Sequence, residues 1–148
     1  MGSRGIRIIG LSVAGVLSAT LATATSATAE AGAPQGALAS CYAQSCEGKW
    51  PDATGCAADA FTPRQNTSPE GIIVELRYSP TCRAAWGRIR SGIPGDRVRV
   101  HSSDGSNYAR EITSGSDTFT QMVNDAGLLA WACVRAAITN TLTCTGSY

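Results

Sequence analysis

Six cysteines constrain this 148-residue chain more than any other feature of its sequence. An even number of cysteines in a small exported chain is typical of a disulfide framework. A zinc site would instead need closely spaced cysteine pairs or several histidines, whereas the closest spacing here is C-x4-C and the chain has one histidine, His101. We therefore expect three disulfides, and neither a metal site nor a cofactor.

Six cysteines can pair in fifteen ways, and the sequence alone does not choose among them. We expect the most local set, which joins Cys41 to Cys46, Cys56 to Cys82 and Cys133 to Cys144. On the loop-entropy model these bridges contribute roughly 2, 3.5 and 3 kcal/mol to the free energy of unfolding. Their sum is comparable to the roughly 5–15 kcal/mol net stability of a typical domain, so we expect reduction to unfold the protein.

The first 29 residues have the pattern of a secretory signal peptide. Two arginines precede an apolar run over residues 8–22, and small residues follow it up to Ala27 and Ala29. We place the cleavage site between Ala29 and Glu30, and we expect a secreted, extracellular protein. Glycine and serine interrupt the apolar run, which falls short of the ~20 apolar residues that a membrane span needs.

Removal of residues 1–29 leaves ten basic and eleven acidic residues, a net charge near −1. A chain without an excess of basic residues lacks the bulk attraction on which nucleic-acid binding depends. We therefore expect no nucleic-acid partner. No segment after the signal is long and apolar enough to predict a membrane span.

The mature chain of about 119 residues has the size of one domain. Residues 30–40 are rich in alanine, glycine and proline, so we expect a flexible lead-in before a single disulfide-stabilised domain over residues 41–148. Residues 41–62 combine three cysteines with turn-forming residues and show no sustained period. This composition predicts a disulfide-pinned loop region with one short helical turn.

Alternation of apolar and polar residues predicts the strands of this domain. The clearest example is residues 72–79, where apolar residues alternate with Glu75 and Arg77, which we expect to form a surface ion pair. The segment from Phe119 to Val123 is compatible with a short helix or with a strand. We predict further strands over residues 82–89, 97–102, 107–112, 128–135 and 141–145. The fold class is therefore mostly β: a small disulfide-stapled sandwich or barrel of five to seven short strands with minor helix.

The hairpin around Asp104-Gly105 carries the candidate binding site. If its turn has two residues, His101 faces Tyr108 and Arg99 faces Arg110. A like-charge pair across two strands is destabilising, which makes more sense if an anionic partner group lies between the arginines. The planar guanidinium also suits carboxylate and phosphate groups. The predicted binding residues are Arg97, Arg99, His101, Tyr108 and Arg110.

A series of short motifs follows the cysteines in a fixed order. The motifs are Cys46-x-Gly48, Pro51, Thr54-Gly55-Cys56-x-x-Asp59-Ala60, Val74-Glu75-Leu76-Arg77-Tyr78-Ser79-x-x-Cys82-x-Ala84-x-Trp86 and Gly95-Asp96-x-Val98. This order resembles a family of small secreted actinobacterial proteins catalogued as a domain of unknown function, and the segment from Val74 to Trp86 is the most specific part. The resemblance implies an extracellular compartment but does not indicate any particular activity, and it suits a binding or sensing module better than an enzyme.

Motifs for catalysis give little support to an enzymatic function. A serine hydrolase would need His101 as its base, and no G-x-S-x-G elbow accompanies that residue. A carboxylate pair for hydrolysis could be drawn from Asp52, Asp59 and Glu75. We assign no catalytic residue and expect a secreted non-enzymatic binding or adaptor module, such as a subunit of an extracellular assembly, whose partner is a secreted protein or an anionic envelope component. The alternative is a small cell-envelope hydrolase that uses acidic residues.

Overall fold

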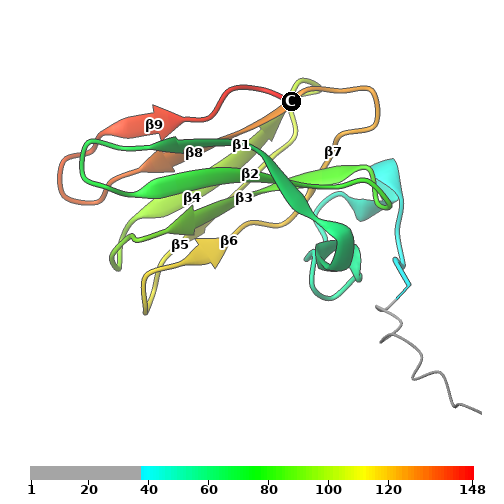
Figure 1. Cartoon of the computed structure of the whole chain (residues 1–148), viewed down its shortest axis with the longest axis horizontal. Helices are drawn as coiled ribbons and strands as arrows, with labels where there is room; N and C mark the ends of the chain where they lie inside the picture. Colours follow the sequence, from blue (N-terminus) through cyan, green and yellow to red (C-terminus); the bar gives the residue numbers. More distant parts are fainter. Residues whose placement is uncertain (1–37) are drawn as a thin grey trace, which may run out of the picture. The chain divides into compact units, whose positions relative to one another are not determined.

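The computed structural model describes residues 38–148, which form nine strands and two short 3-10 helices (Figure 1). The predicted signal peptide, residues 1–29, lies outside the described residues, as does most of the predicted lead-in over residues 30–40. The helices are η1 (Ala43–Cys46) and η2 (Cys56–Asp59). The strands are β1 (Phe61–Thr67), β2 (Ile73–Ser79), β3 (Ala84–Arg90), β4 (Arg97–Ser102), β5 (Asn107–Glu111), β6 (Thr118–Phe119), β7 (Val123–Asn124), β8 (Ala130–Arg135) and β9 (Leu142–Cys144).

The strands form two antiparallel sheets, so the fold is a sandwich rather than a barrel. The first sheet has the order β1-β2-β3-β6, with β7 also paired to β3, and the second has the order β5-β4-β8-β9 (Figure 1). The chain passes from the first sheet to the second between β3 and β4. At this crossing the strands approach closely, since a Cβ atom on Gly87 would lie 2.9 Å from Cγ2 of Val98.

The core lies between the two sheets and takes one face of each. The largest fully buried side chains are contributed by both sheets and their connections, and they include Val74, Leu76, Ile89, Val98, Val100, Ile112, Val123 and Val134. Burial of one such side chain stabilises the fold by roughly 1.5–3 kcal/mol. Because side chains alternate along a strand, the residues between the core positions of β4 and β8 must point outward from the second sheet.

The disulfides lie in two parts of the fold. Cys41–Cys46 and Cys56–Cys82 belong to a second buried cluster, together with Trp86 of β3 and Met122. The third bridge joins Cys133 of β8 to Cys144 of β9, which are directly opposite residues in the strand pair. The structure therefore contains the three local pairings that we expected from the sequence.

The prediction of a mostly β fold is confirmed, with nine strands where we expected five to seven. The additional strands are short or irregular. β6 and β7 have two residues each and settle the segment around Phe119 and Val123 as strand, not helix. β1 contains Pro63 and shows no alternating burial, because it lies at the edge of the first sheet and its pairing with β2 is interrupted by a register shift.

The register that we predicted for the β4–β5 hairpin is wrong by one residue. His101 pairs with Asn107 and Arg99 pairs with Ala109, since the turn contains three residues between Ser102 and Ser106 instead of two. Gly105 occupies the third position with φ +96°, the left-handed conformation that such a turn requires. A shift of one residue moves every side chain of a strand to its other face. The side chains of β5 therefore point opposite to our expectation.

Candidate functional site

A groove of about 460 Å³ runs along the outer face of the second sheet. β4 directs Val98 and Val100 into the core, and its alternate residues Arg97, Arg99 and His101 therefore line the groove. The other lining residues come from β5, β8, β9 and the adjoining loops: Gly95, Glu111, Cys133, Arg135, Ala136, Ala137, Asn140 and Leu142. We call this surface the cationic groove.

Two arginines stand directly opposite each other in the cationic groove. Arg97 of β4 pairs with Arg135 of β8, and Arg99, two residues further along β4, pairs with Cys133. Like charges in opposite positions weaken a strand pair. The floor between the arginines is held by the disulfide from Cys133 to Cys144, which fixes β8 against β9. The fold therefore holds two cationic groups together on a rigid base.

The partners of these arginines leave the groove with a positive charge. Arg97 forms an ion pair of 3.0 Å with Glu111, and both side chains remain about half exposed. An exposed ion pair contributes only about 0–1 kcal/mol, so an anionic ligand can compete with Glu111. Arg99 donates to Oδ1 of Asn107 at 2.9 Å, and Arg135 donates to Oδ1 of Asn140 at 3.0 Å. Three guanidiniums thus share this surface with one lining carboxylate.

His101 adds a titratable group to the same surface. Its ring stacks on Trp131 of β8, with ring centroids 5.2 Å apart and planes 7° from parallel. Partial burial, together with the positive charge of Arg99, lowers the pKa of His101 below its usual value. The imidazole is therefore neutral at neutral pH, and its protonation at acidic pH adds a positive charge to the groove.

The structure divides the five predicted binding residues between two faces. Arg97, Arg99 and His101 line the cationic groove, whereas Tyr108 and Arg110 lie on the opposite face of the hairpin because of the three-residue turn. The guanidinium of Arg110 lies 4.7 Å from the ring centroid of Trp50, and Tyr108 packs against the core. Trp50, and Gly48 beside the hydroxyl of Tyr108, belong to the N-terminal loop region, residues 41–60. Tyr108 and Arg110 therefore attach the second sheet to this region. The predicted opposition of Arg99 and Arg110 does not occur.

Arg135 is the groove residue that sequence reasoning missed. It ends β8, a strand that pairs with β4 although residues 103–129 separate the two strands in the sequence. The local sequence predicts both strands, but nothing in it predicts that they are neighbours. A like-charge pair of the kind that we expected across the hairpin therefore exists, with Arg97 and Arg135 as its members.

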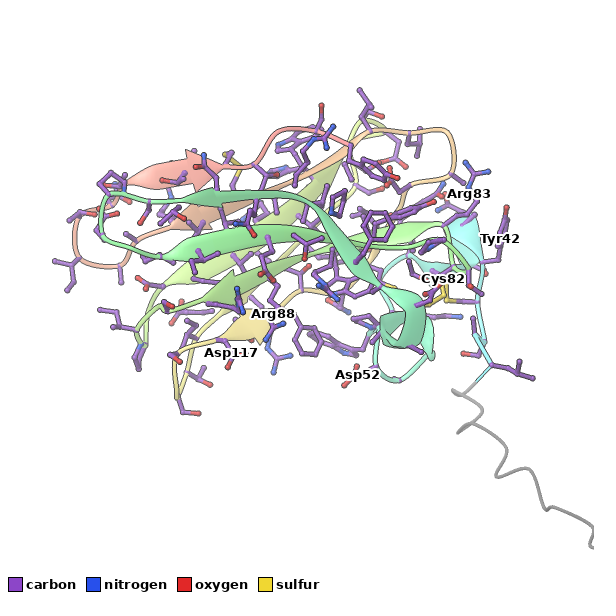
Figure 2. All side chains as sticks on the ribbon, viewed as in Figure 1. Tyr42, Asp52, Cys82, Arg83, Arg88 and Asp117 are labelled. Atoms are coloured by element: carbon purple, nitrogen blue, oxygen red, sulfur yellow. A yellow bond between two sulfur atoms is a disulfide. The ribbon has the colours of Figure 1, made fainter. Side chains whose placement is uncertain are left out.

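The three acidic residues considered for hydrolysis have other partners. Asp52 lies in the N-terminal loop region, where it accepts a hydrogen bond from the amide of Ala53 (Figure 2). Asp59 accepts hydrogen bonds from Ser79 and Thr81 at the end of β2, and these contacts lower its pKa although burial opposes them.

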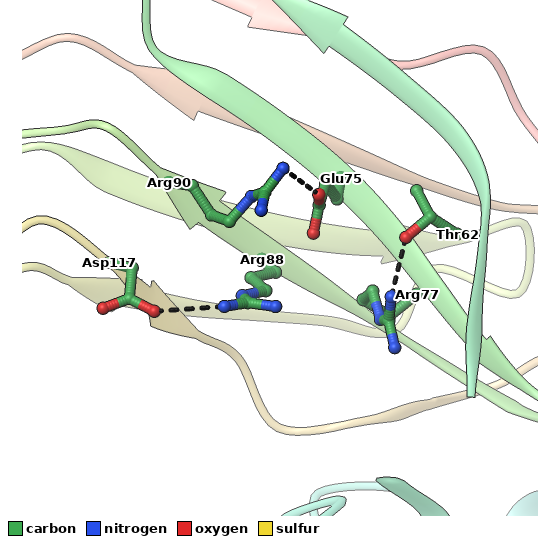
Figure 3. Close-up of polar contacts among 6 residues, drawn as sticks. All are labelled: Thr62, Glu75, Arg77, Arg88, Arg90 and Asp117. Atoms are coloured by element: carbon green, nitrogen blue, oxygen red, sulfur yellow. Dashed lines mark hydrogen bonds and ion pairs between the residues drawn. The ribbon is translucent and has the colours of Figure 1, made fainter. Parts of the chain in front are cut away.

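Glu75 is buried and lies 3.1 Å from Arg90 of β3, so the expected ion pair with Arg77 is not formed (Figure 3). Arg77 instead donates to Thr62 and to the carbonyl of Ala60. Arg90 is the diagonal neighbour of Glu75 on β3, since the register pairs Glu75 with Arg88 and Ile73 with Arg90, and a long side chain can reach a diagonal neighbour on the same face. The carboxylate of Glu75 therefore forms an ion pair between β2 and β3.

Four cysteine sulfurs gather where the N-terminal loop region meets the β2–β3 turn, which contains Cys82 (Figure 2). The sulfur atoms of Cys41, Cys46, Cys56 and Cys82 all lie within 4.8 Å of one another. Zinc binds cysteine as the thiolate, and these sulfurs are joined in two disulfides. In this oxidised form the cluster staples the loops and offers no thiolate ligand.

The sequence matches one known protein family. Residues 44–142 match the model of a family described as "Protein of unknown function (DUF2690)". The chain belongs to this family. The DUF2690 segment contains the entire lining of the cationic groove, and the expected resemblance to a domain of unknown function is confirmed. Neither a curated protein nor a solved structure matches the chain. Over residues 38–148, no helix combines the length and apolar character needed to cross a membrane.

Proposed function

We propose that this protein is a secreted, non-enzymatic binding module whose cationic groove binds the phosphate or carboxylate groups of an anionic component of the cell envelope. The observation that carries the proposal is the direct opposition of Arg97 and Arg135, with Arg99 beside them in the same groove. An arrangement that weakens the sheet is best explained by a ligand that bridges the two charges.

The chemistry of the groove supports an anionic ligand over other classes. Guanidinium groups donate paired hydrogen bonds that match carboxylate and phosphate oxygens. The net charge of the mature chain is near −1, so the positive charge is local to the groove and not a property of the whole surface. This local charge favours recognition of a particular anionic group over general attachment to polyanions such as nucleic acid.

Secretion is supported by two independent features. The first is the signal-like segment over residues 1–29, and the second is the pairing of all six cysteines in disulfides, which persist in oxidising compartments. The partners that Asp52, Asp59 and Glu75 have in the fold favour a binding role over hydrolysis.

The test is a binding titration of the exported protein with a soluble polyanion, polyphosphate of defined length. The Arg99→Ser, Arg135→Ser double variant should bind at least about tenfold more weakly than wild type, since each guanidinium supplies charge-assisted hydrogen bonds. Arg110→Ser is the matched control, because it removes an arginine of the same hairpin from the other face. Equal affinity of the double variant and the wild type would sink the proposal.

A further inference from the structure

The loops at one end of the sandwich carry exposed isoleucines. Ile93, between β3 and β4, is 45% exposed, and Ile138, between β8 and β9, is 83% exposed. Both line a second pocket of about 230 Å³, whose other apolar residues are Ile72 and Ala136. The strand ends in Figure 1 place these loops together at the end that lies away from the N-terminal loop region. Two aliphatic side chains therefore protrude side by side.

The two loops are fastened to each other by Asp96. Its carboxylate, 1% exposed, accepts hydrogen bonds of 2.8 Å from the amides of Ile93 and Ala137. The same residue donates from its backbone amide to the carbonyl of Ile93 at 3.0 Å. The protruding isoleucines are thus presented by one hydrogen-bonded unit, which lowers the entropy that ordering would cost on binding.

Cationic groups lie on the surface that adjoins the protruding isoleucines. Ala136 lines both the apolar pocket and the cationic groove, so the two surfaces are continuous. Arg135 is three residues from Ile138 and Arg97 is four residues from Ile93, which limits these Cα–Cα distances to about 11 and 14 Å. This end of the domain therefore has an apolar tip that adjoins a surface lined by guanidiniums.

We propose that this end of the domain docks on an anionic lipid surface, with Ile93 and Ile138 inserted among the lipids and the arginines of the cationic groove on the headgroup phosphates. The proposal rests on the anion binding proposed above and names its source. A lipid layer presents anionic groups above an apolar interior, and interfacial segments insert about 5–10 Å into it. The adjoining apolar tip and cationic groove offer one surface for each of these two layers.

One acidic group opposes this docking. Glu70 lies beside the tip, where its carboxylate accepts a hydrogen bond from Thr139. Hydrogen bonds from Thr139 and Ser68 lower the pKa of Glu70 to about 2, so it is charged at neutral pH. The attraction must therefore come from the arginines of the groove, and docking should weaken steeply with salt.

The test uses the exported protein with vesicles of phosphatidylglycerol and phosphatidylcholine in equal parts, and with vesicles of phosphatidylcholine alone. Co-sedimentation should show binding to the anionic vesicles and little to the neutral ones. The Ile93→Ser, Ile138→Ser double variant should bind the anionic vesicles at least about tenfold more weakly. Leu129→Ser is the matched control, since Leu129 is 53% exposed and contacts the β4–β5 turn at the other end of β4.

A second variant keeps the test independent of losses in stability. Ile138→Trp should retain vesicle binding and show a blue-shifted emission on the anionic vesicles, because indole favours the membrane interface. Vesicle binding that is unchanged in the isoleucine double variant, or an emission of Ile138→Trp that stays unshifted on bound vesicles, would overturn the lipid proposal.

The outcomes separate the two proposals. If the isoleucine double variant loses binding to the vesicles and keeps wild-type affinity for polyphosphate, while the Arg99→Ser, Arg135→Ser variant loses affinity for polyphosphate, both proposals stand. If the wild-type protein binds polyphosphate but does not bind the vesicles, lipid docking alone is contradicted. The groove then binds a soluble or polymeric anion. Wild type that binds neither probe contradicts both.

Discussion

The buried carboxylate of Asp96 accepts a hydrogen bond of 2.8 Å from the backbone amide of Ala137, a residue 41 positions further along the chain. The other oxygen of this carboxylate accepts a hydrogen bond from the amide of Ile93 in the loop between β3 and β4. One side chain therefore joins the β3–β4 crossing to the β8–β9 loop. These are the loops that flank the cationic groove and carry the protruding isoleucines.

Replacement of Asp96 should destabilise the domain strongly. Asp96→Ala leaves two backbone amides without their acceptor, and unsatisfied buried donors cost about 1–3 kcal/mol each. We expect a loss of about 2–5 kcal/mol in the free energy of unfolding, measured by urea denaturation. Asp117→Ala is the control, because Asp117 is exposed, pairs only with Arg88 in Figure 3, and should cost less than about 1 kcal/mol. Similar losses in the two variants would contradict this role of Asp96.

Asp125 should make the stability of the domain depend on pH. Burial raises its pKa from 3.8 to about 7, although the charge of Arg83 opposes the shift, and its Oδ1 atom has no hydrogen-bond partner. Because the folded pKa lies above the unfolded one, the stability contributed by the protonated carboxyl is present below about pH 4. It is lost as pH rises towards and through about 7.

The variant Asp125→Asn tests whether stability falls with rising pH because of this carboxyl group. It carries no titrating group, so it should be more stable than wild type at about pH 8 and show no such gain at about pH 4. Urea denaturation at the two pH values provides the measurement. A difference between variant and wild type that is the same at both values would show that burial does not hold Asp125 protonated.

The disulfides should differ in their contribution according to the loop that each closes. The sequence separations are 26 for Cys56–Cys82, 11 for Cys133–Cys144 and 5 for Cys41–Cys46. Paired replacement by alanine should therefore cost about 3.5, 3 and 2 kcal/mol in that order, measured by denaturation. The native protein should also take up no alkylating reagent without reductant, as read by intact mass. An adduct on two cysteines would contradict the pairing.

Protonation of His101 should strengthen anion binding in the groove. Its lowered pKa keeps the ring neutral at about pH 7, and the added positive charge appears at a lower pH than it would on an unperturbed histidine. The affinity for polyphosphate should rise from about pH 7.5 to about pH 5, and His101→Gln should remove that part of the rise. Because folding lowers this pKa, protonation also reduces stability below about pH 6.5, so the titrations need a parallel check of folding.

The exported protein should begin at Glu30. The small residues Ala27 and Ala29 meet the requirement of the cleavage site, and N-terminal sequencing of the protein from culture medium decides the point. A start upstream of Ser26, or an intact Met1 in a membrane fraction, would remove the basis for secretion.

Local patterns in the sequence predicted most of the strands, whereas contacts between distant strands could not be predicted. β4 matches its expected bounds because Val98 and Val100 alternate with charged residues. The position of Arg135 opposite Arg97 depends on a pairing between distant segments, and no local pattern encodes it. β1 was missed because an edge strand needs no alternation, and its polar residues resemble a loop.

The error in the hairpin has a different origin. Asp104-Gly105 predicts a turn correctly, but the same dipeptide fits turns of two and of three residues. The amide of Ser102 donates to the carbonyl of Ser106 and the amide of Gly105 donates to the carbonyl of Ser102, which selects the longer turn and leaves Gly105 in a left-handed conformation. One additional residue was enough to separate Arg110 from the groove.

The bridge between Cys133 and Cys144 also bears on how this domain can diversify. It closes the base of the β8–β9 loop covalently, so the two strands keep their register whatever residues stand between them. Doubling the length of a loop costs only about 0.6 kcal/mol in closure entropy. The loop can therefore change its chemistry at Ile138 and Thr139, which lie outside the lining of the groove, while β8 and β9 stay paired. Selection, or a designed library, can vary what the tip recognises on an unchanged frame.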